Sequence, residues 1–196
     1  MGKILLPNPV KLIFSIISAD NDLFYEAKNL LIDYFGKIDM ESDFQPFDYT
    51  SYYRDEMGDG LKQKLVSFEK LILPGRLSSI KINSNKWELI FGTRSDCLDE
   101  VIEKKRKVNL DPGYVTLNKF ILASTKDGPA RIYLKQGIYA EITLRFMNST
   151  YHPLEWTYQN YQTELYISFL NRVREQYKKE IRGYHNKNYI KQKMEK

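Results

Sequence analysis

The sequence predicts an α+β domain in which an antiparallel sheet is backed by helices. Three observations favour this class. Short apolar or alternating segments are bounded by turn residues, other segments have apolar side chains at helical spacing, and glycine-containing turns join neighbouring strands. No repeat, linker or change of composition divides the chain. We therefore expect one domain over residues 1–182, followed by a basic, flexible tail over residues 183–196.

The first strand and helix have the clearest signals. Residues 11–19 are apolar and β-branched, as in a central strand, and Asp20-Asn21-Asp22 then supplies side chains that cap a helix. Gly36 lies where a left-handed C-terminal cap is usual. The helix between them has an apolar face made of Leu23, Ala27, Leu30, Leu31 and Tyr34.

A long hairpin and a second helix are predicted next. Residues 43–54 and 61–72 are extended in character, and Met57-Gly58-Asp59-Gly60 between them suits a turn. Pro74 opens a helix, and a polar loop is expected over residues 92–107. The apolar face of this helix consists of Leu77, Ile80, Ser84, Trp87 and Phe91.

A short strand and a third helix are expected in the middle of the chain. Val108-Asn109-Leu110 resembles a strand that stops at Asp111-Pro112-Gly113, because proline and glycine favour a turn. The helix is predicted over Thr116 to Thr125, with Leu117, Phe120, Ile121 and Ser124 on one side.

A second hairpin joins residues 131–134 to residues 138–146 across Lys135-Gln136-Gly137. Alternation puts apolar side chains on one face, namely Ile132, Leu134, Ile138, Ala140, Ile142, Leu144 and Phe146. The other face carries Arg131, Tyr133, Tyr139, Glu141, Thr143 and Arg145. A last helix has an apolar stripe of Tyr166, Phe169, Leu170, Val173 and Tyr177.

The order of these elements predicts a topology. The first six match a ferredoxin-like βαββαβ core. The remaining elements would extend its antiparallel sheet by an added hairpin and a C-terminal helix.

Composition and charge exclude several classes of protein. Lys and Arg number 30 and Asp and Glu 25, but residues 177–196 hold seven of the basic and two of the acidic ones, so the rest of the chain is formally neutral. No apolar run is long enough to span a membrane. Cys97, His152 and His185 are too few for a zinc site, and the single cysteine favours a cytoplasmic protein.

Several motifs in order resemble one family. They are Pro46-Phe47-Asp48-Tyr49-Thr50-x-Tyr52-Tyr53-x-x-Glu56-Met57-Gly58-x-Gly60-Leu61-Lys62, Ser67-Phe68-Glu69, Val108-Asn109-Leu110-Asp111-Pro112-Gly113-Tyr114, Arg131-Ile132-Tyr133-Leu134 and Gly137-Ile138-Tyr139-Ala140-Glu141. The sequence is similar here to the bacterial family known as domain of unknown function 4416. The resemblance ends near Tyr177 and implies a compact single domain of unassigned activity, some members of which are labelled GTP-binding. A Gly-x-x-x-x-Gly-Lys-Ser/Thr loop is absent from the sequence.

The first candidate site is the aromatic, polar segment that contains Asp48, Tyr49, Thr50 and Tyr53. Phenol rings stack on flat ligands, and the neighbouring hydroxyl and carboxylate groups form hydrogen bonds around them. The alternative is that these rings belong to the core and the sheet edge, since aromatic residues are enriched in strands anyway.

The second candidate lies between the expected short strand and third helix, and contains Asn109, Asp111, Gly113 and Tyr114. Ligands favour strand ends, and the free N–H groups at a helix N-terminus suit an anion. The alternative is a plain turn in which Asp111 caps the helix.

Charged residues that follow could complete a phosphate site. Lys119, Lys126 and Arg131, with Tyr133 and Tyr139 nearby on the polar face, would bind the anion. Asp111 and Glu141 would form a carboxylate pair that holds Mg²⁺ or acts as a general base. The alternative is an ion-pair network in which Arg131 binds Glu141 across the hairpin and no ligand takes part.

Three functions remain open on this evidence. The leading hypothesis is a ligand-binding or accessory domain that takes a nucleotide or an RNA segment. The first alternative is an enzyme of phosphoester or glycosyl chemistry that uses Asp111 and Glu141. The second is an interaction scaffold that uses Trp156, Tyr158 and the last helix. Both a monomer and a homodimer are compatible with the sequence, and the protein partner is unknown.

Overall fold

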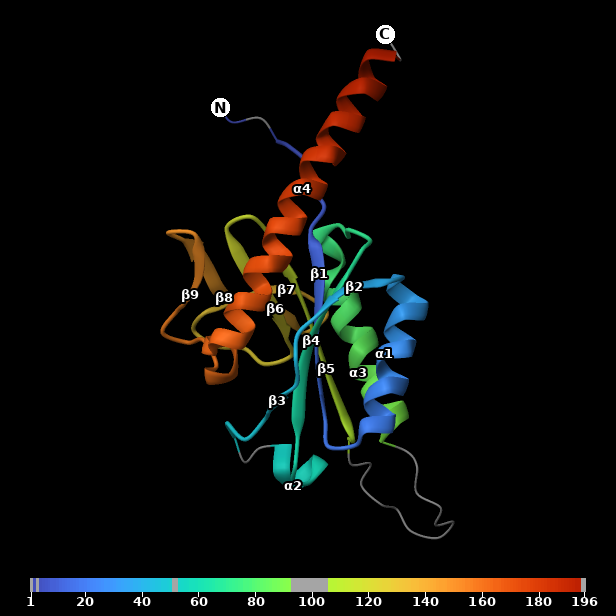
Figure 1. Ribbon diagram of the computed structural model, residues 1–196, viewed down its shortest axis with the longest axis vertical. Coiled ribbons are helices and arrows are strands. Elements are labelled where there is room, and N and C mark those ends of the chain that lie inside the picture. Colours follow the sequence, from blue (N-terminus) through green and yellow to red (C-terminus); the bar gives the residue numbers. More distant parts are fainter. Residues whose placement is uncertain (1, 3, 51–52, 93–105, 195–196) are drawn as a thin grey trace.

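An antiparallel sheet with helices on both faces forms the body of the molecule (Figure 1). The computed structural model describes residues 2, 4–50, 53–92 and 106–194. Its elements are β1 Lys11–Ser18, α1 Asn21–Phe35, β2 Ile38–Glu41, β3 Gln45–Pro46, α2 Arg54–Met57, β4 Lys62–Phe68, η2 Pro74–Arg76, α3 Leu77–Phe91, β5 Val108–Val115, β6 Lys119–Ser124, β7 Arg131–Lys135, β8 Ile138–Met147, β9 Thr150–Pro153, η3 Gln159–Gln162 and α4 Glu164–Met194. The described strands have the order β2-β4-β1-β5-β6-β8-β7, with β3 paired to β4 and β9 to β8. The predicted α+β class with a large antiparallel sheet is therefore confirmed.

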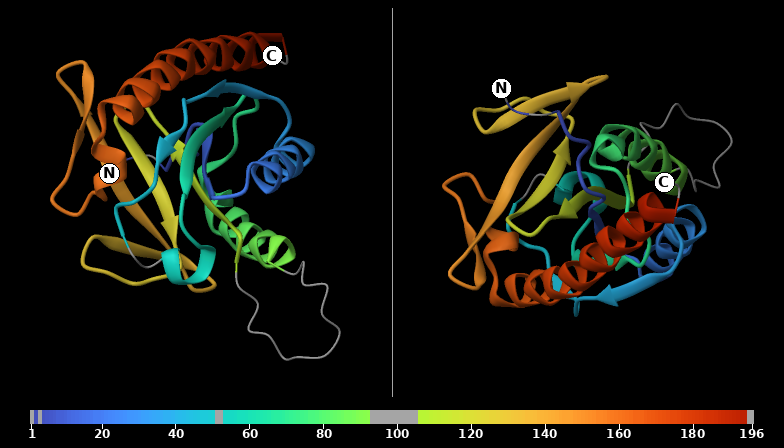
Figure 2. Two further views of the ribbon diagram at one scale, coloured as in Figure 1. Left: turned by 60° about the horizontal axis from the view of Figure 1, so that its bottom comes forward. Right: turned by 90° about the horizontal axis from the view of Figure 1, so that it is seen from above.

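Strand β1 lies at the centre of two hydrophobic cores. All its residues are buried, and it pairs with β4 on one side and β5 on the other. Leu12, Phe14 and Ile16 point to the face that α1 and α3 cover, whereas Ile13 packs in the core beneath α4. Figure 2 shows α4 on the opposite side of the sheet from α1 and α3. A strand buried on both faces accounts for the continuous apolar run seen in the sequence.

The predicted caps and apolar faces of the helices are mostly confirmed. The Asp20 side chain accepts hydrogen bonds from the backbone N–H groups of Asp22 and Leu23, and Gly36 ends α1 with φ 87°. The predicted apolar face of α3 is buried throughout, as is that of α4. Tyr34 is an exception, because it is 63% exposed, although one side of its ring lies against Trp87.

The predicted third helix, Thr116 to Thr125, is wrong, and so is the turn at Asp111-Pro112-Gly113. Strand β5 continues through this tripeptide, and a hairpin closed by Thr116 leads into β6. Strand β6 is apolar on both faces, so its spacing also fits a helix. A Cβ atom at Gly113 would lie 2.4 Å from the carbonyl oxygen of Ile121, so glycine serves close strand packing here.

The first predicted hairpin is also more divided than expected. Within residues 43–50 and 53–54 only Gln45–Pro46 is a strand, and α2 begins at Arg54. Both β2 and β3 pair with β4, which ends at Phe68. The rest of the predicted strand, residues 69–72, forms only one bridge, between Ile72 and Val10.

A β-bulge changes the faces predicted for the second hairpin. Ile142 lies opposite Ile121, but Leu144 lies opposite the adjacent residue Phe120, which leaves Thr143 as the extra residue. Leu144 and Phe146 therefore pack in the core beneath α4. Ile142 stays on the other face and is 36% exposed. Arg131 lies opposite Glu141, as the ion-pair alternative expected, and Tyr133 lies opposite Tyr139.

Two sequence predictions concern the ends of the described ranges. The expected loop over 92–107 falls largely on residues 93–105, which lie outside the described residues. The backbone of α4 is helical up to Met194, so it includes most of the predicted tail, whose flexibility stays a prediction. Among the described helices, none has the length and apolar character needed to cross a bilayer.

Helix α4 is fastened to the sheet by the buried residue Lys11. Its ammonium group donates hydrogen bonds to Asp39 of β2 and, at 2.7 Å, to Glu180 of α4. We predict that Lys11→Ala lowers the free energy of unfolding by about 3–5 kcal/mol, because it leaves the mostly buried Asp39 carboxylate without its cation. Urea denaturation measures this loss. Lys28→Ala, which breaks the partly exposed pair with Glu41, should cost less than about 1 kcal/mol, and equal losses would contradict the prediction.

Candidate functional site

A cavity of about 860 Å³ lies where β5 and β6 separate. Backbone pairing of these strands covers only Gly113–Val115 opposite Phe120–Leu122. Beyond it, Asn109 and Asp111 of β5 line one side of the cavity, and Ala123 and Ser124 of β6 line the other. We call the space between these four residues the β5–β6 slot.

Pro112 explains why the two strands separate. Gly113 lies opposite Leu122, so the next pair along the strands is Pro112 with Ala123. Extension of the ladder to Asp111 and Ser124 would need a hydrogen bond from the backbone N–H of residue 112 to the Ala123 carbonyl. Proline has no N–H, so the ladder ends here and the slot opens.

Two side chains of α3 replace the missing strand along the open edge of β5. The Leu110 N–H donates to Glu88 Oε1 at 2.7 Å, and Lys81 Nζ donates to the Leu110 carbonyl oxygen at 3.2 Å. Lys81 and Glu88 are seven residues apart, which places them on one face of the helix. Their burial is thus explained by backbone groups that would otherwise lack partners.

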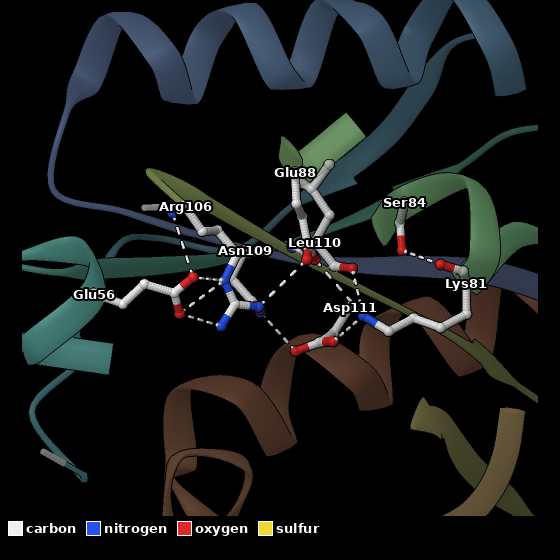
Figure 3. A network of polar contacts seen from close by, with 8 residues as sticks. All are labelled: Glu56, Lys81, Ser84, Glu88, Arg106, Asn109, Leu110 and Asp111. Carbon is white, nitrogen blue, oxygen red and sulfur yellow. Dashed lines mark hydrogen bonds and ion pairs between the residues drawn. The ribbon is translucent and has the colours of Figure 1, made fainter. Parts of the chain in front are cut away.

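The same two residues belong to a network that fixes the Asp111 carboxylate (Figure 3). Lys81 Nζ lies 2.7 Å from Asp111 Oδ1, and Asn109 Nδ2 donates to Asp111 Oδ2 at 2.7 Å. Arg106 donates to Asn109 Oδ1 at 2.8 Å and binds Glu56 of α2 with two of its nitrogen atoms. The Asp111 side chain remains 28% exposed at the cavity wall.

The carboxyl groups of Asp111 and Glu88 are shifted in opposite directions. Burial acts to raise the pKa of Asp111, but the Lys81 ammonium and the hydrogen bonds from Lys81 and Asn109 outweigh it, so this pKa is lowered. Burial also raises the pKa of Glu88. The Lys81 ammonium acts to lower this pKa but does not outweigh burial, so the pKa of Glu88 stays above its ordinary value. Asp111 is therefore held ionised at neutral pH as a hydrogen-bond acceptor.

A second ion pair lies on β7 and β8. Arg131 Nε donates to Glu141 Oε2 at 2.8 Å, and the two other guanidinium nitrogens donate to the Lys126 carbonyl oxygen and the Tyr158 hydroxyl. Glu141 is buried, and its Oε1 atom has no hydrogen-bond partner among the described residues. A buried acceptor without a partner costs roughly 1–3 kcal/mol, so it marks a place where a donor group is missing.

The cavity brings together many, but not all, of the predicted site residues. Its wall includes Tyr49, Thr50, Tyr53, Asn109, Asp111, Lys126, Arg131 and Glu141. Outside this wall lie Asp48, Gly113, Tyr114, Lys119, Tyr133 and Tyr139. The expected anion site at a helix N-terminus is wrong, because Tyr114 lies within β5 and the element that follows it is strand β6. The Arg131–Glu141 ion pair that the sequence offered as an alternative is present.

Sequence inspection missed several residues of the wall. Lys81 and Glu88 appear as ordinary polar positions of an apolar helix, and their spacing of seven was the one available signal. Arg106 was hidden in a basic run, and Tyr161 in an aromatic loop. Asp111 and Glu141 both line the cavity, but each is bound by a different cation, and the general-base hypothesis stays a prediction. Over the described ranges no three His, Cys, Asp or Glu side chains gather as a metal-binding group.

The fold and cavity define an antiparallel α+β domain with a cavity lined by apolar, aromatic and charged side chains. Over residues 8–177 the chain matches the family described as Domain of unknown function (DUF4416), and it belongs to that family. Neither the curated proteins nor the solved structures gave a match. The matched region contains every residue of the cavity wall, whereas residues 178–196 lie beyond it.

We predict that Pro112→Ala closes part of the slot. Alanine supplies the missing N–H, so the β5–β6 ladder can extend to Asp111 and Ser124. Hydrogen exchange measured on the whole chain should show a protected amide at residue 112 of the variant, and slower exchange than in the wild type at the amide of Thr125. Pro129→Ala, at an exposed position, is the matched control for the added flexibility of the unfolded chain. Unchanged exchange in Pro112→Ala would contradict the role given to this proline.

We also predict how acid acts through Asp111. Because its pKa lies below the ordinary value of 3.8 in the folded chain, Asp111 contributes stability that is present above that pH and is lost as the pH falls through the folded pKa. Asp111→Asn should therefore lose less stability than the wild type as the pH falls from about 5 toward the folded pKa of Asp111. Urea titrations at each pH measure this difference. If Asp127→Asn, an exposed control, shows the same reduced loss of stability at low pH, the assignment to Asp111 is refuted.

Proposed function

We propose that this protein binds a small polar ligand with a flat ring, of the nucleoside or nucleotide class, in the cavity between β5 and β6. The cavity volume of about 860 Å³ supports this, because pockets for small molecules measure roughly 300–1,000 Å³. A ligand of this size also fits the cavity better than an RNA segment, which would need an open groove along the surface.

The observation that carries the proposal is the meeting of two kinds of side chain in one cavity. Tyr49, Trp156 and Tyr158 line it and are partly exposed, so their rings are accessible for stacking. Asp111 and Glu141 line it as well and are held in fixed orientations by Lys81 and Arg131. Rings and oriented polar groups together are what a ligand with an aromatic base and hydroxyl groups requires.

Two finer predictions go with this proposal. Apart from the short elements β3, α2 and η2, the chain order up to β5 is β1, α1, β2, β4, α3 and β5. Their strands have the spatial order β2-β4-β1-β5 with antiparallel pairing throughout, which supports a ferredoxin-like core within the larger sheet. The single cysteine supports a cytoplasmic location.

A thermal-shift screen of the full chain tests the proposed function. The panel consists of the four ribonucleosides, their 5′-monophosphates and a short single-stranded RNA. At a concentration of about 100 Kd, a ligand stabilises the folded state by about 2.7 kcal/mol, which raises Tm by roughly 5–10 °C for a chain of this size.

Two variants and one control accompany the screen. Trp156→Leu removes a ring from the cavity wall and Asp111→Asn removes its fixed charge, so both should reduce the shift. Lys119→Ala, an exposed position outside the wall, should keep it. No rise in Tm with any compound of the panel would contradict the proposed function.

A further inference from the structure

We infer that the part of the ligand inserted into the β5–β6 slot is a hydroxyl-bearing sugar ring, which donates hydrogen bonds to the acceptors of the cavity wall. This inference rests on the proposed function. It concerns which end of the ligand enters the slot, and it follows from the hydrogen-bonding capacity that the protein leaves unused.

Three cationic side chains of the wall, Arg131, Arg106 and Lys81, already bind partners within the protein. All three guanidinium nitrogens of Arg131 donate to Glu141, Lys126 and Tyr158. The corresponding atoms of Arg106 donate to Glu56, Glu88 and Asn109, and Lys81 is bound to Leu110 and Asp111. A phosphate group inserted among them would have to share cations whose charge is already balanced by carboxylates of the chain.

The acceptors of the wall, in contrast, have capacity left. An ionised carboxylate offers about four lone-pair positions, and Asp111 uses two of them on Lys81 and Asn109. Glu141 Oε1 is unpartnered among the described residues and buried, so a ligand group reaches it when the side chains that cover it move aside. The Ala123 carbonyl lacks the donor that Pro112 cannot supply. A ligand group that donates hydrogen bonds would therefore complement the acceptors of the slot.

Charge balance favours an uncharged donor. Lys81 lies 2.7 Å from Asp111, and Arg131 lies 2.8 Å from Glu141, so each free acceptor already has a neighbouring positive charge. An ammonium group next to these two ion pairs would gain little net attraction, because each carboxylate is already paired, whereas a hydroxyl group binds without adding a charge. Adjacent hydroxyl groups on one ring can also bind acceptors on two strands at once.

The position of the aromatic residues places the sugar inward and the base outward. Tyr49, Trp156 and Tyr158 are partly exposed, but Asp111 and especially Glu141 lie deeper. A base stacked on those rings leaves its sugar pointing to the buried acceptors. Vicinal hydroxyl groups of ribose thus fit the slot, and any phosphate stays toward solvent.

Calorimetric titration of the full chain tests this orientation. Each of the four ribonucleosides is compared with its 2′,3′-dideoxy counterpart, which has the same base but lacks both hydroxyl groups. We expect the dideoxy compounds to bind at least about tenfold more weakly, as the loss of two hydrogen bonds to ionised acceptors implies. In Asp111→Asn and Glu141→Gln the difference between the two series should shrink, while Lys119→Ala should keep it.

The outcomes separate the inference from the proposed function. Equal affinity of the two series overturns the inference and leaves the proposed function standing. Binding of neither series overturns the proposed function. Methyl ribofuranoside serves as a third probe, and its binding in the absence of nucleoside binding would support the sugar site while contradicting the proposed ligand class. The comparison of ligands on the wild-type chain does not depend on whether the variants fold.

Discussion

The missing N–H of Pro112 is the constraint on which the candidate site depends. It ends the pairing of β5 with β6 at Gly113 and leaves the preceding part of β5 without a neighbouring strand on that edge. Helix α3 packs against that edge and supplies Glu88 and Lys81 to the backbone of Leu110. The same two side chains form further ion pairs, Lys81 with Asp111 and Glu88 with Arg106. One main-chain defect therefore accounts for a cavity, a buried ion network and a fixed carboxylate.

The electrostatics of the cavity are self-contained. Lys81 and Arg106 are matched with carboxylates on the α3 side, and Arg131 is matched with Glu141 on β8. Buried pairs of this kind contribute little net stability, because desolvation offsets the attraction between the charges. They do orient hydrogen-bonding groups before a ligand arrives, which lowers the cost of ordering them on binding. For this reason we propose that the cavity recognises a neutral polar group rather than attracting an anion.

Local signals predicted most elements of the fold, and the errors cluster around the site. Asp20, Gly36 and the apolar face of α3 followed directly from capping and periodicity. The structure of the segment from Asp111 to Thr125 could not be predicted in this way. Asp111-Pro112-Gly113 resembles a turn in the sequence, and only the strand pairing shows that Pro112 lies within a strand whose open edge lacks its N–H. Asp111, Arg131 and Glu141 could be proposed from neighbouring motifs. Lys81, Glu88 and Arg106 could not, since their role is set by contacts with distant parts of the chain.

We propose that the separated strands β5 and β6 form a binding slot for the hydroxyl-bearing end of a small ligand. A crystal structure of the full chain grown with a saturating ribonucleoside tests it most directly. The account predicts ligand density between Asp111 and Ala123, with sugar hydroxyls within hydrogen-bonding distance of the carboxylates of Asp111 and Glu141. Continuous pairing of β5 and β6 as far as Ser124, or a ligand bound away from this slot, would contradict it.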